Sequence, residues 1–243
     1  MEKVSLFILT MGYGFIAMFL STIVHESGHA IAGVLQGWKF MQLVVGPFKL
    51  YRNDIHDRIH FGLEKNPVLW CGIGGAVPSC EEDADIEIFG RTLLAGPLAS
   101  VILGIIVGIP GILTRSLFLL TWMAVSVGLG LFNMIPGIMS TGILFNDGSR
   151  YYRIRKGGQE KAEEEAIFKC AMRVWETEEL YRQEYIDAML ASERAEFRYL
   201  GHYYALLNAK SSGDETALKA HRELMEKMEK TVPSTIRDLC VIE

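Results

Sequence analysis

The chain has 243 residues, half of them hydrophobic, and a formal net charge of −5 at pH 7. Charged residues are concentrated after position 150, so residues 1–150 are typical of a membrane domain and residues 151–243 of a water-soluble one. Neither part has the excess of basic residues that nucleic-acid binding needs, and this excludes nucleic acid as a partner.

The first predicted element is a membrane helix. Val4–Val24 carries no charge and matches the roughly 20 residues that a helix needs to cross the hydrocarbon core. A cleaved signal peptide is the alternative, but its apolar region is usually about 7–15 residues long. No small-residue cleavage site precedes His25 either, so we expect the helix to be retained.

A candidate metal site lies at the end of this run, in the HExxH sequence His25-Glu26-Ser27-Gly28-His29. On a helix, residues four apart share a face, so both imidazoles can bind one Zn²⁺. Glu26 is then placed to act as a general base toward water.

The position of the motif strengthens this interpretation. Charged residues at the centre of a membrane helix cost about 2.5–3.5 kcal/mol each on insertion scales, and they usually mark function. The alternative is that the motif merely lies at the membrane surface. Ala30–Leu35 continues the apolar helix beyond the motif, which favours the functional interpretation.

The segment between the first two spans is predicted to contain a short β-hairpin. Met41–Leu50 and His60–Leu63 favour strands and are separated by turn-forming residues. The acidic run Glu81–Glu87 is interpreted as a solvated loop. His56 and His60 are four apart, but in a hairpin this spacing brings no shared face, and we assign no second metal site there.

Two more spans are predicted within Thr92–Thr114 and Ser116–Asn146. The last run is too long for a simple span, and Pro136 disfavours helix within it. We expect a helix over about Leu117–Ile135, followed by irregular backbone through Gly137 and Gly142. Such backbone is tolerated at membrane depth only where protein buries it or a wet cavity lines it, so the break indicates a cavity.

Basic residues predict the orientation of the three spans. They are frequent between Trp38 and Arg91, while only Lys3 and Arg115 lie on the other side. By the positive-inside rule, the central loop and the tail after Asp147 are cytoplasmic, and the N-terminus lies outside.

Asp147 is the candidate third metal ligand, because a catalytic zinc usually takes three protein ligands and one water. It ends the last uncharged run and is followed by Gly148, which allows a tight turn. An ordinary aspartate at a membrane exit is the alternative interpretation.

Together these motifs resemble the site-2 protease family of intramembrane zinc metalloproteases. That family combines HExxH in one membrane helix with Asp-Gly on a later one, often preceded by Asn-x-x-Pro. The matching sequences here are His25 to His29, Ala95-Gly96-Pro97-Leu98-Ala99-Ser100, Asn133-Met134-Ile135-Pro136 and Asn146-Asp147-Gly148.

The resemblance implies that His25, His29 and Asp147 are the ligands, Glu26 is the base, and Asn133 helps to hold substrate or the transition state. Two features depart from the family pattern. Ser100 stands where asparagine is common, which weakens a polar role there, and Gly96 could serve helix packing alone. Ten residues separate Pro136 from Asp147, a longer re-entry than in other members.

The tail is predicted to be helical, since apolar residues recur at helical spacing from Gly158 to Met228. These positions include Ala166, Cys170, Val174, Tyr181, Tyr185, Met189, Tyr203, Leu206, Leu207, Leu218 and Leu224. Gly213 separates two of the helices. Amphipathic helices that pack on the membrane domain or on each other are favoured over a dedicated partner-binding module, because solenoids normally need three or more repeats. We expect the tail to be separable from the hydrolytic machinery.

The predicted fold is an all-α integral membrane protein with a three-helix metalloprotease core, residues 1–150, a short β-hairpin, and a helical cytoplasmic tail, residues 151–243. The predicted function is zinc-dependent cleavage of membrane-spanning or membrane-associated substrates in or next to the bilayer. The alternative is a non-proteolytic membrane binding protein that keeps the fold. Glu26 argues against it, because a structural zinc site needs no base.

Overall fold

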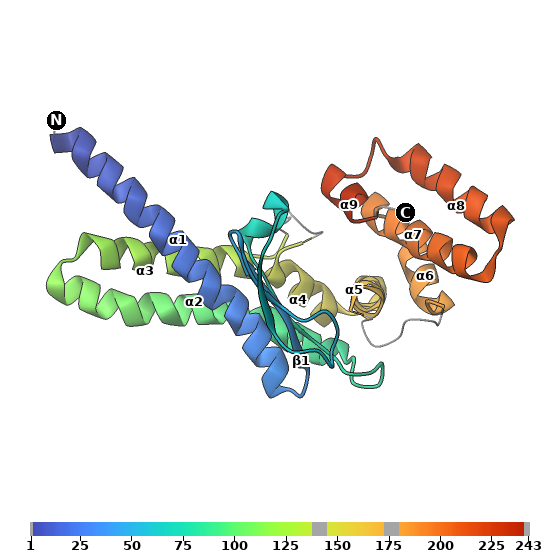
Figure 1. Cartoon of the computed structure of the whole chain (residues 1–243), viewed down its shortest axis with the longest axis horizontal. Helices are drawn as coiled ribbons and strands as arrows, with labels where there is room; N and C mark the ends of the chain where they lie inside the picture. Colours follow the sequence, from blue (N-terminus) through green and yellow to red (C-terminus); the bar gives the residue numbers. More distant parts are fainter. Residues whose placement is uncertain (1, 138–144, 173–179, 241–243) are drawn as a thin grey trace.

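The computed structural model describes residues 2–137, 145–172 and 180–240. Within these ranges the chain is mostly helical, with one small antiparallel sheet. In Figure 1 a long N-terminal helix crosses a hairpin of two helices, the sheet lies beside it, and shorter helices follow toward the C-terminus. Two residues of the sequence predictions, Gly142 and Val174, lie outside the described residues.

The helices are α1 (Glu2–Leu35), α2 (Ile86–Thr114), α3 (Leu117–Met134), α4 (Asp147–Lys156), α5 (Gly158–Ala171), α6 (Gln183–Leu190), α7 (Ala195–Ser212), α8 (Glu215–Met228) and α9 (Ser234–Leu239), with a 3-10 turn at Pro67–Cys71. The strands are β1 (Lys39–Val45), β2 (Phe48–Tyr51), β3 (His60–Leu63) and β4 (Ile73–Val77).

Three helices, α1, α2 and α3, are long and apolar enough to cross a membrane. The three predicted spans are therefore confirmed as helices, and α3 ends at Met134, one residue from the predicted end. The first helix runs on to Leu35, so the whole HExxH motif is helical. Arg115, in the left-handed conformation at φ 53°, caps α2 and makes the tight connection to α3.

Small residues let these helices approach closely. A side chain at Gly28 would place its Cβ 2.7 Å from the carbonyl oxygen of Ala95, so α1 packs backbone to backbone on α2. At Gly130 a Cβ would lie 2.6 Å from the carbonyl oxygen of Pro97, which brings α3 equally close to α2. Such contacts are the usual basis of helix association in membranes.

The sheet is larger than the predicted hairpin. It has four antiparallel strands in the order β3-β2-β1-β4. The hairpin prediction missed β4, because its sequence contains Gly74 and Gly75 and glycine is depleted in strands. Here the packing requires glycine, since a Cβ at Gly74 would lie 2.1 Å from the carbonyl oxygen of Glu26.

The sheet runs along α1 from the C-terminal end of this helix toward its middle. At one end a Cβ at Gly33 would lie 2.7 Å from Cβ of Ala76, and at the other the rings of Phe19 and Phe48 are 6.1 Å apart. The neighbouring strands β2 and β3 expose four apolar side chains on one face: Phe48, Leu50, Phe61 and Leu63.

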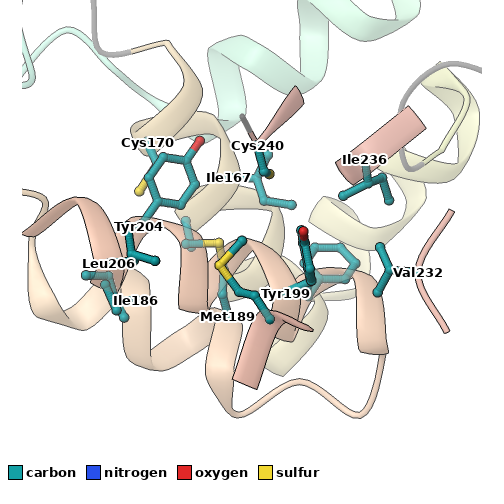
Figure 2. Packing of buried hydrophobic residues seen from close by; sticks show 14 of the residues in the cluster. Ile167, Cys170, Ile186, Met189, Tyr199, Tyr204, Leu206, Val232, Ile236 and Cys240 are labelled. Carbon is teal, nitrogen blue, oxygen red and sulfur yellow. The ribbon is translucent and has the colours of Figure 1, made fainter. Parts of the chain in front are cut away.

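The C-terminal helices form a hydrophobic core of their own, called here the tail core. Its buried members include Ile167, Cys170, Ile186, Met189, Tyr199, Tyr204, Leu206, Val232, Ile236 and Cys240 (Figure 2). The predicted helical periodicity is confirmed where it is described, and Gly213, at φ 73°, ends α7 as predicted.

The tail also packs against the membrane domain. Phe168 of α5 stacks between Trp38 and Phe89, with ring centroids 5.5 and 4.5 Å away. The Tyr185 hydroxyl donates to the Glu81 carboxylate at 3.0 Å, and burial raises the pKa of Tyr185, which keeps it a neutral donor. The amphipathic helices are thus docked on the membrane domain.

Candidate metal centre

Two elements far apart in sequence bring three possible ligands together. His25 and His29 lie one turn apart on α1, and Asp147 is the first residue of α4. Nε2 of His25 lies 3.1 Å from Oδ2 of Asp147, and Nε2 of His29 lies 3.4 Å from it. Within residues 2–137, 145–172 and 180–240 this is the single trio of metal-binding side chains whose ligand atoms lie within 4.8 Å of one another.

The hydrogen bonds around the two imidazoles suit a metal. Nδ1 of His29 donates to the carbonyl oxygen of Thr92 at 2.7 Å, which leaves the lone pair on Nε2. Nδ1 of His25 lies 3.0 Å from Oγ of Ser100, so its Nε2 also faces Asp147. Metal-binding histidines almost always donate their second ring nitrogen in this way. Two nitrogens and one carboxylate, in side chains 6%, 12% and 19% exposed, fit a catalytic Zn²⁺.

Ser100 is a site residue that the sequence analysis undervalued. It is fully buried on α2, and besides facing His25 it accepts a hydrogen bond at its carbonyl from Ser126 of α3 at 2.8 Å. The position of Ser100, one helical turn after Gly96, was the available signal. Its hydroxyl fixes the ring orientation of His25.

Gly96 does more than permit helix packing. A Cβ at this position would lie 2.3 Å from Nε2 of His29, so any side chain would occupy the space of the imidazole. The glycine therefore creates room for a ligand on the neighbouring helix.

The residues around Asp147 explain the Asn-Asp-Gly sequence. Nδ2 of Asn146 donates to the carbonyl oxygens of Phe132 and Ile135 at 3.2 and 3.1 Å, at the C-terminal end of α3. Oδ1 of Asn146 accepts from the Ser149 amide and caps α4. A Cβ at Gly148 would lie 2.3 Å from the carbonyl oxygen of Met134, so only glycine fits there.

The trio lines a cavity of about 470 Å³. Its walls come from α1, β4 and α3, and also from the tail through Met172 and Thr235. Asn133 lines the cavity, and its Nδ2 donates to the carbonyl oxygen of Leu129 at 3.0 Å. The structure therefore brings Asn133 to the site, while its role toward substrate stays a prediction.

Glu26 also lines this cavity and lies against β4. A Cβ at Gly72 would lie 2.5 Å from Oε1 of Glu26, and Gly72 has a positive φ of 117°. The backbone just before β4 therefore lies directly against the carboxylate.

His60, which follows His56 by four residues, has a different arrangement. Nε2 of His60 lies 2.8 Å from Oδ2 of Asp57, and this hydrogen bond is the main cause that lowers the pKa of Asp57 to about 2. His60 thus has a carboxylate partner from its own loop.

Comparison with known proteins adds one finding. The family model described as peptidase family M50 matches residues 13–115, a range that holds His25, Glu26, His29 and Ser100. Neither the search of curated proteins nor that of solved structures found a match. Asn133 and Asp147 lie beyond the matched range, so the structure alone joins them to the site. Over residues 13–115, this chain is therefore similar to peptidase family M50.

Proposed function

We propose that this protein is a zinc metalloprotease that hydrolyses peptide bonds in or next to membrane-spanning segments of other proteins. The observation that carries the proposal is that Asp147 of α4 meets His25 and His29 beside Glu26, and that these last three residues lie on a helix able to cross a membrane. The match to peptidase family M50 supports the same class of reaction.

His25, His29 and Asp147 would hold Zn²⁺ and leave one coordination position open. When bound, Zn²⁺ supplies Lewis acidity that polarises the scissile carbonyl and acidifies water. Glu26 would accept the proton of the attacking water and later give it to the leaving amine. Ser100 and the Thr92 carbonyl would hold the imidazoles of His25 and His29 in their orientations while the proton is transferred.

The substrate would bind as an extended segment along β4. This strand lies at the edge of the sheet and pairs only with β1 among the described strands. Exposed edges accept peptides through main-chain hydrogen bonds. A bound segment would lie over Glu26, and a helical substrate would have to unwind locally to reach it. Asn133 has a second amide N–H that could hold the substrate carbonyl.

A non-proteolytic membrane binding protein is the rival function. Glu26 speaks against it, because a carboxylate beside an open metal site has no part in a purely structural centre. The cavity, which is large enough for several side chains, likewise favours a reacting substrate.

We also propose that the N-terminus lies outside and that the central segment and tail are cytoplasmic. The apolar face formed by Phe48, Leu50, Phe61 and Leu63 adjoins Phe19 in the middle of α1, so this face would contact lipid.

Labelling of single cysteines tests this orientation. In a background with Cys71 and Cys80 replaced by serine, an impermeant thiol reagent applied to intact cells should label Thr114→Cys, at the C-terminal end of α2. It should leave Lys219→Cys on α8 unlabelled until the cells are opened. The reverse labelling pattern would show that the protein has the opposite orientation in the membrane. Cys170 and Cys240 are buried and can remain in place.

Metal removal tests the function itself. Protein purified in detergent should cleave a peptide copied from a membrane span, lose this activity in a zinc chelator, and recover it when Zn²⁺ is restored in excess over the chelator. Activity that survives complete removal of zinc, as measured by metal analysis, would contradict the proposal. An inert wild-type protein that holds one equivalent of zinc would favour the rival function.

A further inference from the structure

The residue two positions before the third ligand belongs to the core of the tail. Phe145 is 9% exposed and belongs to the tail core, where Phe197 lies beside it. Its ring centroid lies 6.1 Å from that of Phe197 in α7. The segment that carries Asp147 is therefore anchored among helices that the sequence assigns to a separate tail.

Two cations strengthen this anchor. The guanidinium carbons of Arg153 and Arg194 each lie 4.7 Å from the centroid of the Phe145 ring, and Arg153 also lies 4.9 Å from the ring of Phe197. Cation–π contacts of this kind fix the position of a ring as well as burying it. Phe145 is thus held by α4, by the N-terminal cap residue of α7 and by the tail core together.

The residues after Asp147 are held by the tail as well. Glu164 of α5 is fully buried, and its two carboxylate oxygens accept from Nε of Arg150 at 2.9 Å and from Nε of Arg153 at 2.8 Å. Arg153 also pairs with Glu163. A buried carboxylate that satisfies two arginines fixes α4, which begins at Asp147, onto α5.

Asp147 therefore lies at a junction. Asn146 attaches it to the end of α3 in the membrane domain, whereas Phe145 and Glu164 attach it to the tail. Met172 and Thr235 of the tail also line the cavity. The position of the Asp147 carboxylate therefore depends on how the tail is docked on the membrane domain.

We propose that the tail is part of the metal site, and that Phe145 is a positioning residue that sets the place of Asp147 relative to His25 and His29. This inference rests on the proposed function. It departs from the separable tail that the sequence predicts, and it implies that a molecule that shifts the tail would change metal affinity.

The test uses the full chain in detergent and compares Phe145→Ala with Leu206→Ala. Both variants remove buried packing from the same core, but Leu206 lies on α7 outside the segment that carries the ligand. Competition with a chromophoric chelator measures zinc affinity, and the visible absorption of the Co²⁺-loaded protein reports ligand geometry. Circular dichroism and thermal melts establish that each variant is folded at the temperature used.

Phe145→Ala should bind zinc at least about tenfold more weakly and show altered Co²⁺ bands, because supporting residues typically change metal affinity 10–100-fold. Leu206→Ala should match wild type in both measurements, and Phe145→Leu, which restores apolar volume, should recover most of the affinity. If Phe145→Ala does not fold, Glu164→Gln is tested in its place and should weaken zinc binding several-fold.

Folded Phe145→Ala, or Glu164→Gln in its place, with wild-type zinc affinity and Co²⁺ spectrum would overturn the inference while leaving the proposed function intact. Equal losses in Phe145→Ala and Leu206→Ala would also overturn it, since general destabilisation would then explain both. A wild-type protein that binds no zinc would overturn the inference and the proposed function together.

Discussion

Replacing Glu26 by glutamine is expected to leave zinc binding unchanged and to lower the rate of peptide hydrolysis by a factor of about 10²–10⁴. Glutamine keeps the shape of the side chain and fits the same space beneath β4, but it cannot accept a proton from water. The measurement is the initial rate on a membrane-span peptide, taken beside the zinc content of the same preparation.

The matched control is Glu87→Gln, a change at an exposed glutamate in the first turn of α2, whose partners Arg155 and Lys161 lie away from the cavity. Its rate should equal that of wild type. Full activity in Glu26→Gln would show that another group moves the proton. Loss of zinc in that variant would instead show that Glu26 serves the metal site as a structural residue.

Asp147→Ala is expected to weaken zinc binding by at least about 100-fold, because removing a ligand should cost more than the 10–100-fold typical of supporting residues. It also leaves the Nε2 atoms of His25 and His29 without the carboxylate that they face at 3.1 and 3.4 Å. Chelator competition at fixed pH measures the loss, and hydrolysis should fall in parallel.

Two comparisons make this result specific. Ser100→Ala removes the partner of Nδ1 of His25 but no ligand, so it should weaken zinc by only about tenfold. Asp214→Ala removes an exposed carboxylate at the start of α8 and should change nothing at the metal. Zinc affinity in Asp147→Ala equal to that in Asp214→Ala would place the third ligand elsewhere.

Much of the core was determined by local sequence. The three apolar runs predicted three membrane helices, because a bilayer demands about 20 apolar residues for each span. HExxH placed two imidazoles on one helical face by periodicity alone, and the helix continued past the motif to Leu35 because Ala30–Leu35 stayed apolar. The prediction of Asp147 rested on its place beside glycine at the end of a charge-free run.

The remaining features came from contacts between segments distant in sequence, which no local pattern encodes. The strand β4 has little intrinsic strand preference, and it forms because its glycines let the backbone lie on Glu26. Ser100 became a partner of His25 only through the packing of α1 on α2. In the sequence, Phe145 is an ordinary apolar residue before Asn-Asp-Gly. Only the docking of the tail connects the segment of Asp147 to helices far along the chain.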